Sequence, residues 1–566
     1  MSISPFRVDQ NTPDISNLDA ESKAEKAEVE QVEDVLNQTP YQPKELRSGG
    51  ILNWLQKKNP SPQFLADVAK MNETELDPRK VKHVERKIDL LIMPALAICY
   101  MFYYVDKTTL SYAAIFDLKN DLHLGSSDYN WLSSLFYFGW LGWALPTNLL
   151  MQKFPLNKYL AFNLLLHDPR INPCVIDRIF QIFLWGVLLM AQAASRNFTE
   201  LAVLRVLSGA AEATADPAFV LITGTWYTRT QQPTRIGYWY LANGFGIALG
   251  GLFGYAIGHV SSLSSWKYEF IIIGALCSAW AIFMAIFVPD SPYFSHWFTP
   301  EERLIIVSRK RGDHNSTDTR EWKPAQVLEA FIDPKTYLFF LFGFTANVPN
   351  GATSNFGTLI VQGFGFDTFQ TTLMQIPYGM VIVAFILAAI FINAKLPPGY
   401  RTLLMALTNV PTVVGFAMVA WCKGTAPRLA GFWLTGASNA TFVLGLSLLS
   451  GNVGGQSKKA IASAAVFLGV AIGNIVGPFL FKTSEAPTYY TGVVGCLVSR
   501  ALEIVIILIL RVIFIVSNRR KDRFVAKGHV RYDGRSTELE DITDWKNPAF
   551  RYVTVSPISL TPVERA

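Results

Sequence analysis

The sequence predicts an all-α integral membrane protein with twelve transmembrane helices, and two observations support this prediction. Of the 566 residues, 50% are hydrophobic and 17% are charged, whereas soluble domains contain about 25% charged residues. Between Asp89 and Ser517 the apolar residues fall into runs of roughly twenty, the length of a helix that crosses a ~30 Å hydrocarbon core. The expected solvent of this part of the chain is therefore the lipid bilayer.

Each apolar run gives one expected span. The spans are expected at 89–112, 129–151, 159–195 (interrupted), 199–224, 235–260, 267–288, 336–360, 371–393, 401–420, 428–450, 459–482 and 490–517. Because their number is even, both ends of the chain are expected on the same side of the membrane.

Basic residues indicate which side this is. Arg79, Lys80, Lys82, Arg86 and Lys87 directly precede the first span, and further lysines and arginines occupy alternate short loops. This pattern predicts cytoplasmic termini, because positively charged loops stay in the cytoplasm. It also explains the net charge of +6, so no nucleic-acid partner is expected.

Polar segments divide the chain into five expected parts. These are a disordered cytoplasmic N-tail (1–85), an N-terminal six-helix bundle (86–288), a cytoplasmic linker (289–335), a C-terminal six-helix bundle (336–517) and a cytoplasmic C-tail (518–566). The linker contains a charged stretch, Pro300–Arg311, that is expected to be helical. Two six-helix halves suit a secondary transporter, whose substrate binds at the seam near the midplane. An unrelated twelve-helix channel or membrane enzyme is the alternative.

The third span is interrupted by residues 164–181, which place four charged residues and two prolines at membrane depth. Such a segment is costly unless it is buried or lines a cavity. Its removal joins Tyr159–Asn163 to Ile182–Ser195 in one continuous span. One explanation is a re-entrant substrate loop. We favour a retained intron, since eighteen codons preserve the reading frame, and we expect a structure of the long chain to show a bulge, an expelled loop or a shifted third helix.

Few other charged residues lie deep inside the spans: Asp106 and Lys107 in the first, and Arg205, Glu212 and Asp216 in the fourth. Each costs about 2.5–3.5 kcal/mol at a helix centre and by default marks a functional site. Arg205 and Glu212 are seven residues apart, so they share one helix face at a separation of roughly 10 Å. The structural alternative is a pair of salt bridges, Asp106 with Arg205 or Lys107 with Glu212, that joins the two helices.

A functional site is favoured for two reasons. Apolar packing can replace a purely structural buried pair at little cost, whereas two acids and two bases together supply an anion site and a proton carrier. Burial at mid-span disfavours the charged form of Glu212, which suits a group that loads and releases a proton. Polar and aromatic residues within spans are candidates for the cavity wall: Trp239, Tyr240, Asn243, Asn347, Asn350, Asn355 and Gln375.

Glycines crowd the fifth span (243–258) and the eleventh (469–478). Such spacing lets helices approach closely. Both static packing and sliding between helices are compatible with it.

Four stretches carry a resemblance to a known family: DKTTLSYAA from Asp106, RVLSGAAEATADPAF from Arg205, WYTRTQQPTRIGYWYLANGFG from Trp226 and GGQSKKAIASAAVFLGVAIGNIVGP from Gly454. They resemble the anion:cation symporter group of the major facilitator superfamily and, within it, the fungal allantoate permease branch. The resemblance covers about 86–517. The third span of that family has no interruption.

The resemblance implies the major facilitator fold and proton-coupled import of a small organic anion. The expected proton-coupling residues are Glu212 and Asp106, and the expected substrate-binding residues are Arg205, Lys107, Asn243, Trp239 and Asn350. One departure is Lys107, where related symporters often have arginine, because lysine lacks the planar fork that binds a carboxylate bidentately. Another is QKFPLNKY from Gln152, which lacks the acidic and arginine residues of the loop between helices two and three.

The expected substrate is allantoate, another ureide or a related small carboxylate, carried with a proton across the plasma membrane by alternating access. A vitamin-like carboxylate (nicotinate, pantothenate or biotin) and a non-transporting nutrient sensor are the alternatives. An enzyme is not expected, since the spans contain no nucleophile–base pair. No cofactor or metal is expected either, and the five cysteines lie too far apart to suggest a disulfide framework or a zinc site. The protein is expected to be a monomer.

Overall fold

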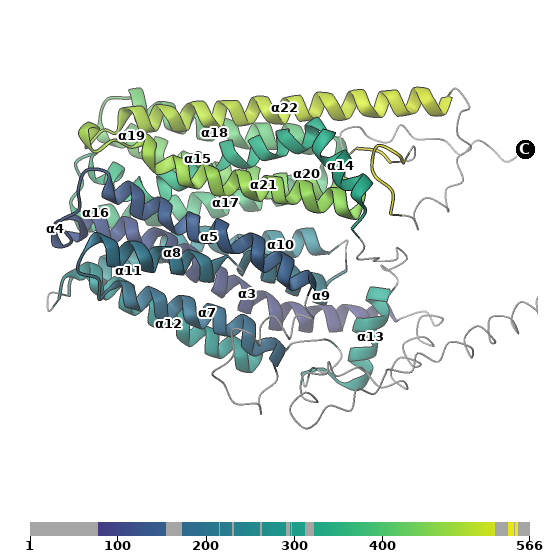
Figure 1. The fold of residues 1–566 in the computed structure, drawn as a ribbon, viewed down its shortest axis with the longest axis horizontal. Coiled ribbons are helices and arrows are strands. Elements are labelled where there is room, and N and C mark those ends of the chain that lie inside the picture. Colours follow the sequence, from purple (N-terminus) through teal and green to yellow (C-terminus); the bar gives the residue numbers. More distant parts are fainter. Residues whose placement is uncertain are drawn as a thin grey trace, which may run out of the picture. The chain divides into compact units, whose positions relative to one another are not determined.

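The computed structural model describes residues 77–153, 173–213, 215–228, 231–260, 263–289, 292, 295, 297–311, 322–526, 541–547 and 550–552, and all regular elements in these ranges are helices (Figure 1). Residues 1–76 of the expected N-tail, and residues 164–172 of the interruption, lie outside the described residues.

The N-terminal half contains the first six expected spans, each formed by one helix or by two consecutive helices. These are α3 (Pro78–Ile115), α5 (Asp128–Lys153), α7 (Pro173–Gln192), α8 (Phe198–Glu212) with α9 (Ala215–Trp226), α10 (Gln232–Tyr240) with α11 (Ala242–Gly258), and α12 (Ser265–Phe287). The short helix α4 (Leu118–Asp121) follows the first span.

The C-terminal half contains the other six. These are α15 (Pro334–Gln362), α16 (Thr368–Leu373) with α17 (Gln375–Lys395), α18 (Arg401–Trp421), α19 (Thr425–Leu434) with α20 (Ser438–Asn452), α21 (Gln456–Val476), and α22 (Tyr490–Ala526). Between the halves lie α13 (Pro300–Arg311), at the bounds expected for the charged stretch of the linker, and α14 (Pro324–Ile332).

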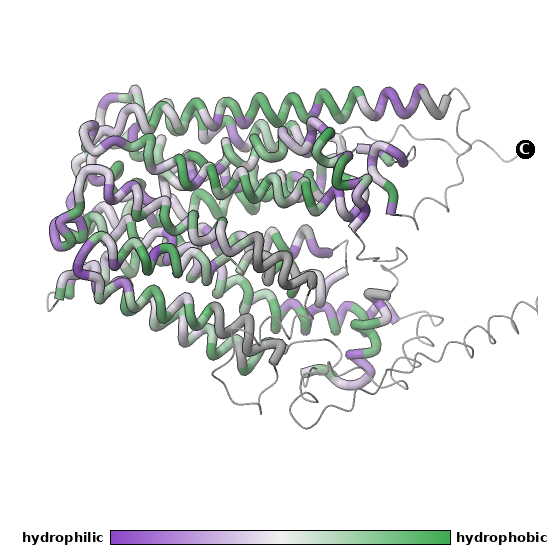
Figure 2. Tube along the Cα trace, in the orientation of Figure 1, coloured by the Kyte–Doolittle hydropathy of each residue, from purple (hydrophilic) through white to green (hydrophobic). Residues whose placement is uncertain are grey.

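The distribution of polarity is that of a membrane protein. Eight of the described helical segments are long and apolar enough to cross a membrane, by length and composition, and hydrophobic residues dominate along the helices in Figure 2. Large apolar side chains are exposed on the outside, such as Ile286 at 67% and Leu407 at 66%, whereas Asn243 and Asn409 are fully buried. An apolar exterior around a partly polar interior is stable only in lipid.

The two halves meet mainly along α3 with α15, α5 with α21, and α11 with both α16 and α17. Glycine permits the closest of these contacts. A Cβ atom on Gly244 of α11 would lie 2.4 Å from the carbonyl oxygen of Gly379 of α17, so no side chain fits there. Within the C-terminal half, Gly469 and Gly473 of α21 lie equally close to the backbone of α15. The glycines of the fifth and eleventh spans thus serve close helix packing.

The third span differs from the one expected after removal of the interruption. Helix α7 begins at Pro173, so residues 173–181 of the interrupting segment form its first turns in place of Tyr159–Asn163. At 20 residues the helix spans about 30 Å. The long chain therefore completes its third helix with residues that we expect the working protein to lack; this expectation stays a prediction.

Two segments outside the spans pack against the helices at the end where α3 begins. Helix α13 contacts the start of α3, with Glu301 and Glu302 paired to Lys80 and Lys87 at 2.6 Å and 2.8 Å. The second, called here the C-terminal segment, comprises Asp541–Asn547 and Phe550–Tyr552. It contacts the beginnings of α15 and α21 and the end of α22. Sequence analysis did not predict this packing of the C-tail.

Candidate functional site

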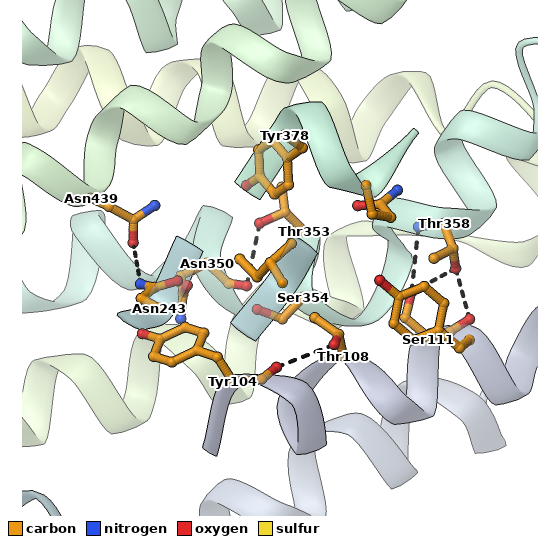
Figure 3. Close-up of a pocket in the computed structure, with 14 residues that line it drawn as sticks. Tyr104, Thr108, Ser111, Asn243, Asn350, Thr353, Ser354, Thr358, Tyr378 and Asn439 are labelled. Carbon is orange, nitrogen blue, oxygen red and sulfur yellow. Dashed lines mark hydrogen bonds between the residues drawn. The ribbon is translucent and has the colours of Figure 1, made fainter. Parts of the chain in front are cut away.

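A pocket lies at the seam between the halves (Figure 3). Its walls come from α3 and α11 on one side and from α15, α17 and α20 on the other, and its lining residues are uncharged. Asn243, Asn350 and Asn439 present amide groups to it, and Tyr104 and Tyr378 present aromatic rings. The free space inside the pocket has room for roughly one water molecule. This conformation is therefore contracted around the pocket.

Hydrogen bonds across the seam explain the contraction. Asn243 Nδ2 donates to Asn439 Oδ1 at 2.9 Å, which joins α11 to α20. Thr358 Oγ1 of α15 donates to the carbonyl oxygen of Ser111 of α3 at 2.7 Å, and Ser111 Oγ lies 2.7 Å from Thr358 Oγ1 (Figure 3). Both wall helices of the N-terminal half are thus tied to the C-terminal half at the pocket itself.

Further bonds close one end of the seam. Tyr129, Asn130 and Ser134, all in the first two turns of α5, donate to backbone carbonyl groups of the C-terminal half, namely those of Asn355 at 2.6 Å, Pro478 at 3.0 Å and Ile475 at 2.8 Å. These bonds lie at the end of the bundle where α3 finishes and α5 begins, which we call the closed end. At the opposite end α3 begins and α22 ends (Figure 1).

The predicted charges Asp106 and Arg205 lie inside the N-terminal half, behind the pocket wall. Asp106 is 1% exposed, and its Oδ2 accepts a hydrogen bond from Trp185 Nε1 of α7 at 2.7 Å. Arg205 is 4% exposed and interacts electrostatically with both Asp106 and Glu212. Its guanidinium group stacks over Phe136 of α5 at 5.0 Å from the ring centroid. Cation and acids therefore form one buried electrostatic unit.

Lys107 connects this unit to the pocket. Its ammonium group lies 4.2 Å from the ring centroid of Tyr103 and 5.0 Å from that of Tyr104, distances at which a cation is attracted to an aromatic face. Tyr104 lines the pocket. Lys107 thus contacts a side chain of the cavity wall. Glu212, which is 2% exposed, belongs to the same half.

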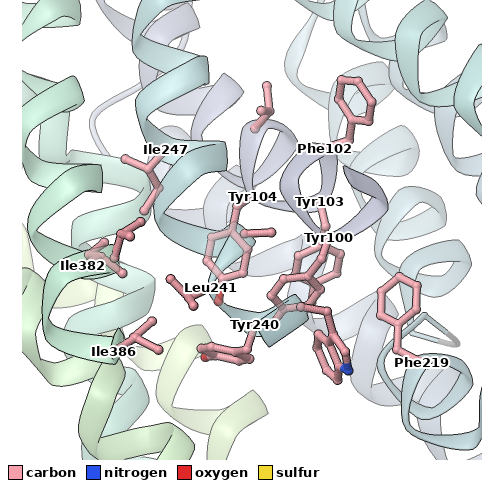
Figure 4. Packing of buried hydrophobic residues seen from close by; sticks show 14 of the residues in the cluster. Tyr100, Phe102, Tyr103, Tyr104, Phe219, Tyr240, Leu241, Ile247, Ile382 and Ile386 are labelled. Carbon is pink, nitrogen blue, oxygen red and sulfur yellow. The ribbon is translucent and has the colours of Figure 1, made fainter. Parts of the chain in front are cut away.

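Trp239 belongs to an aromatic cluster and not to the pocket wall. Its ring meets those of Tyr100 at 4.9 Å and Phe219 at 5.6 Å, and Figure 4 shows Tyr100, Tyr240 and Phe219 packed together. Of the predicted substrate-binding residues, Asn243 and Asn350 line the pocket, and Arg205, Lys107 and Trp239 do not. Their roles stay predictions. The side chain of Asp216 lies outside the described residues.

Sequence analysis missed two sets of buried charges. Arg500 and Glu503 of α22 form an ion pair at 2.7 Å, and Glu503 also accepts from Asn409 Nδ2 at 3.0 Å. Glu269 of α12 is 1% exposed. Arg500 and Glu503 are charged residues inside an apolar run, so the rule that singled out the fourth span would have found them too. In the part of the chain that the structure describes, no cluster of His, Cys, Asp and Glu is suited to hold a metal ion.

Two helical halves around a polar pocket at their seam define a membrane transporter. Residues 178–478 match the family model of the Major Facilitator Superfamily, and the chain belongs to this superfamily. It is a multi-pass membrane transporter and not an enzyme. The predicted fold class is confirmed.

Curated relatives confirm the predicted branch. An uncharacterized transporter of Schizosaccharomyces pombe is 36% identical over 475 residues, which cover 83% of this chain and 86% of the relative. The allantoate permease of Saccharomyces cerevisiae is 30% identical over 559 residues, which cover 96% of this chain and 99% of the permease. The chain is thus similar to an allantoate permease over almost its whole length.

Solved structures show the same fold. A bacterial homolog of the human lysosomal transporter Spinster superposes with a TM-score of 0.51 at 14% identity, covering 77% of this chain and 96% of that one. The xylose transporter XylE from E. coli gives a TM-score of 0.51 at 14% identity, covering 73% and 96%. At this identity the likeness concerns the fold alone.

Proposed function

We propose that the protein is a proton-coupled importer of a small organic anion, with allantoate or another ureide as the first candidate. The observation that supports this most is the buried unit of Asp106, Arg205 and Glu212, with Lys107, directly behind a polar pocket. A charged group at this depth is costly and by default belongs to a transport pathway. The likeness to the Saccharomyces cerevisiae allantoate permease supports the choice of substrate.

Competition for Arg205 supplies a physical basis for coupling. In the contracted conformation the guanidinium group interacts with the carboxylates of Asp106 and Glu212. When a substrate carboxylate takes its place beside Arg205, these acids lose their counter-charge. An ionised carboxylate is strongly disfavoured without a partner in a low-dielectric interior, so each acid that loses Arg205 tends to bind a proton. Anion binding and proton binding are then linked.

The pocket supplies the groups that would recognise the rest of the substrate. Asn243, Asn350 and Asn439 offer amide donors and acceptors, which complement the amide groups of a ureide. The bonds that now satisfy these amides would exchange for substrate bonds when the halves move apart, as in alternating access. We also propose cytoplasmic termini, a plasma-membrane location and a monomeric state, in line with the basic residues before the first span.

The test is an uptake panel in cells that lack their own ureide uptake. Labelled allantoate, nicotinate, pantothenate and biotin are offered separately, with and without an uncoupler of the proton gradient. We expect accumulation of allantoate or another carboxylate that the uncoupler abolishes. Accumulation that persists with the uncoupler would contradict proton coupling. No uptake of any anion by protein that reaches the membrane would favour a non-transporting sensor.

A further inference from the structure

Glu269 is a carboxyl group buried without a partner. It lies near the beginning of α12, in the closed end of the bundle, and is 1% exposed. Neither Oε1 nor Oε2 has a hydrogen-bond partner. Among the described residues, no lysine, arginine or histidine nitrogen lies within 4.0 Å of it, and Lys267, the nearest cation along α12, lies over the ring of Trp266.

The surroundings of Glu269 connect it to the pocket. A Cβ atom on Gly254 of α11 would lie 3.3 Å from Glu269 Oε1, 3.3 Å from Tyr112 Cδ1 of α3 and 3.2 Å from Thr372 Cγ2 of α16. Three side chains from three helices therefore converge on this glycine. The Tyr112 hydroxyl is also buried without a hydrogen-bond partner. Tyr112 and Thr108, one turn away on α3, both line the pocket.

The neutral form of Glu269 is the one that fits this environment. An ionised carboxylate without a cation or a hydrogen-bond donor costs several kcal/mol or more at such a position. Glu503 is equally buried, but Arg500 and Asn409 satisfy its charge, which is the arrangement of a structural acid. Glu269 has no such arrangement, and the titratable group that faces it from the packed helices is Tyr112.

Helices α11 and α16 are packed tightly beside Glu269 at the closed end. Gly251, one turn from Gly254 on α11, packs so tightly on α16 that a Cβ atom there would lie 2.5 Å from the Thr372 carbonyl oxygen. Thr372 and Glu269 approach the same point beside Gly254, so separation of α11 from α16, which opens the seam at this end, would remove one of the groups that enclose the Glu269 carboxyl. The carboxyl group then gains water as a hydrogen-bond donor and can ionise.

We propose that Glu269 is a second proton-binding site of this transporter, which holds its proton while the closed end is shut and exchanges it with solvent when that end opens. The inference rests on the proposed proton coupling. It adds a second site for a proton at the closed end of the N-terminal half.

The test compares Glu269→Gln with Asp117→Asn in reconstituted vesicles. Asp117 is an exposed acid at the same end of the bundle, so its variant controls for a change of surface charge. Uphill accumulation is measured across one pH unit, and exchange of labelled for unlabelled substrate is measured without a gradient. A coupled proton contributes about tenfold to accumulation per pH unit. We therefore expect Glu269→Gln to accumulate about tenfold less than wild type with near-normal exchange, and Asp117→Asn to match wild type.

A conservative variant keeps the proposal testable if the glutamine variant does not reach the membrane. Glu269→Asp retains a carboxyl group on a side chain that is one methylene group shorter. We therefore expect this variant to remain proton-coupled, with the pH dependence of uptake shifted relative to wild type. Two results would overturn the role of Glu269. The first is that Glu269→Gln accumulates substrate like wild type with an unchanged pH profile of uptake, and the second is that Glu269→Asp leaves this profile unchanged. If wild-type accumulation itself is independent of the proton gradient, the proposed function fails instead, and the two failures are thereby distinguished.

Discussion

The C-terminal segment should detach from the helices when Asp544 is replaced by asparagine. Asp544 is fully buried, accepts a hydrogen bond from Lys335 of α15 and pairs with Lys458 of α21 at 2.8 Å. It also accepts from the Tyr552 hydroxyl of the same segment. One carboxylate therefore links the segment to two helices of the C-terminal half.

The size of the effect follows from what remains after the substitution. Loss of one partner of a buried ion pair costs about 3–5 kcal/mol. Both lysines keep Asp333, at 3.3 Å from Lys335 and 2.8 Å from Lys458, and Lys458 also keeps Glu329 at 2.8 Å. The lower end of the range, about 3 kcal/mol, is therefore expected, which corresponds to an increase of about a hundredfold in the population of the detached segment.

Hydrogen exchange of backbone amides in 541–552 measures this population. The control is Asp522→Asn, which removes the partner of Arg551 in the same segment at 3.1 Å, but in an exposed pair with side chains 39% and 56% accessible. Exposed pairs contribute about 0–1 kcal/mol, so exchange should increase less than about fivefold. Equal protection in Asp544→Asn and wild type would show that packing of the segment does not depend on the buried charges.

The pH dependence of docking gives a second readout of the same contact. Burial raises the pKa of Asp544, but the ammonium groups of Lys335 and Lys458 outweigh burial and hold this pKa below its usual value. An acid with a depressed folded-state pKa contributes stability above its unfolded pKa and loses it as the pH falls through the folded one. Protection of the segment should therefore be constant from pH 7 to about pH 4 and decrease only below that, since unfolded aspartate titrates near ~3.9.

Three further predictions concern transport and the third span. Glu212→Gln should lower uphill accumulation by about tenfold per pH unit of gradient while exchange survives; full accumulation would remove Glu212 from coupling. Arg205→Ala should weaken anion binding at least about 30-fold, since it removes a buried cation, and Arg205→Lys should recover part of the affinity. Unchanged affinity in the alanine variant would show that the substrate does not bind at Arg205. Sequencing of cDNA should show that most transcripts lack the codons for 164–181, and equal uptake by long and short forms would support a genuine loop.

The arrangement of helices could be predicted because membrane insertion imposes a length on each apolar run. Every expected span except the third coincides with one helix or with two consecutive helices, and even the charged helix Pro300–Arg311 was expected at its observed bounds. The third span is the exception, since an apolar run does not reveal which flanking residues complete a helix. Residues 173–181 form its first turns, although they belong to the segment expected to be absent.

The orientation of site residues could not be predicted with the same success. Thr108 lines the pocket and Lys107 does not, because adjacent residues on a helix point about 100° apart and the sequence does not fix the rotation of the helix. Trp239 and Asn243 are four residues apart, so in one continuous helix they would lie on the same face. They nevertheless occupy different environments, because the chain changes from α10 to α11 at Leu241.

Long-range charge pairing was also beyond sequence analysis. Asp544 and Lys335 are 209 residues apart, and their pairing has no periodicity that a sequence could show. Glu269 lies so near the beginning of its span that its side chain could be expected to reach water, as charged groups near helix ends do. Only the packing of α3, α11 and α16 around it makes it a buried acid.

The distribution of buried acids suggests which half responds to protons. Asp106, Glu212 and Glu269 all belong to the N-terminal half, where Asp106 and Glu212 share the charge of Arg205 and the carboxyl group of Glu269 has no hydrogen-bond partner. In the C-terminal half, the span residue Glu503 is paired with Arg500, and the acids beside Lys335 and Lys458 form a closed network with the C-terminal segment. A change in protonation therefore alters the charge balance of the N-terminal half and leaves the C-terminal half fixed. Under the proposed mechanism, α3 and α11 are the wall helices whose contacts at the seam respond to the proton.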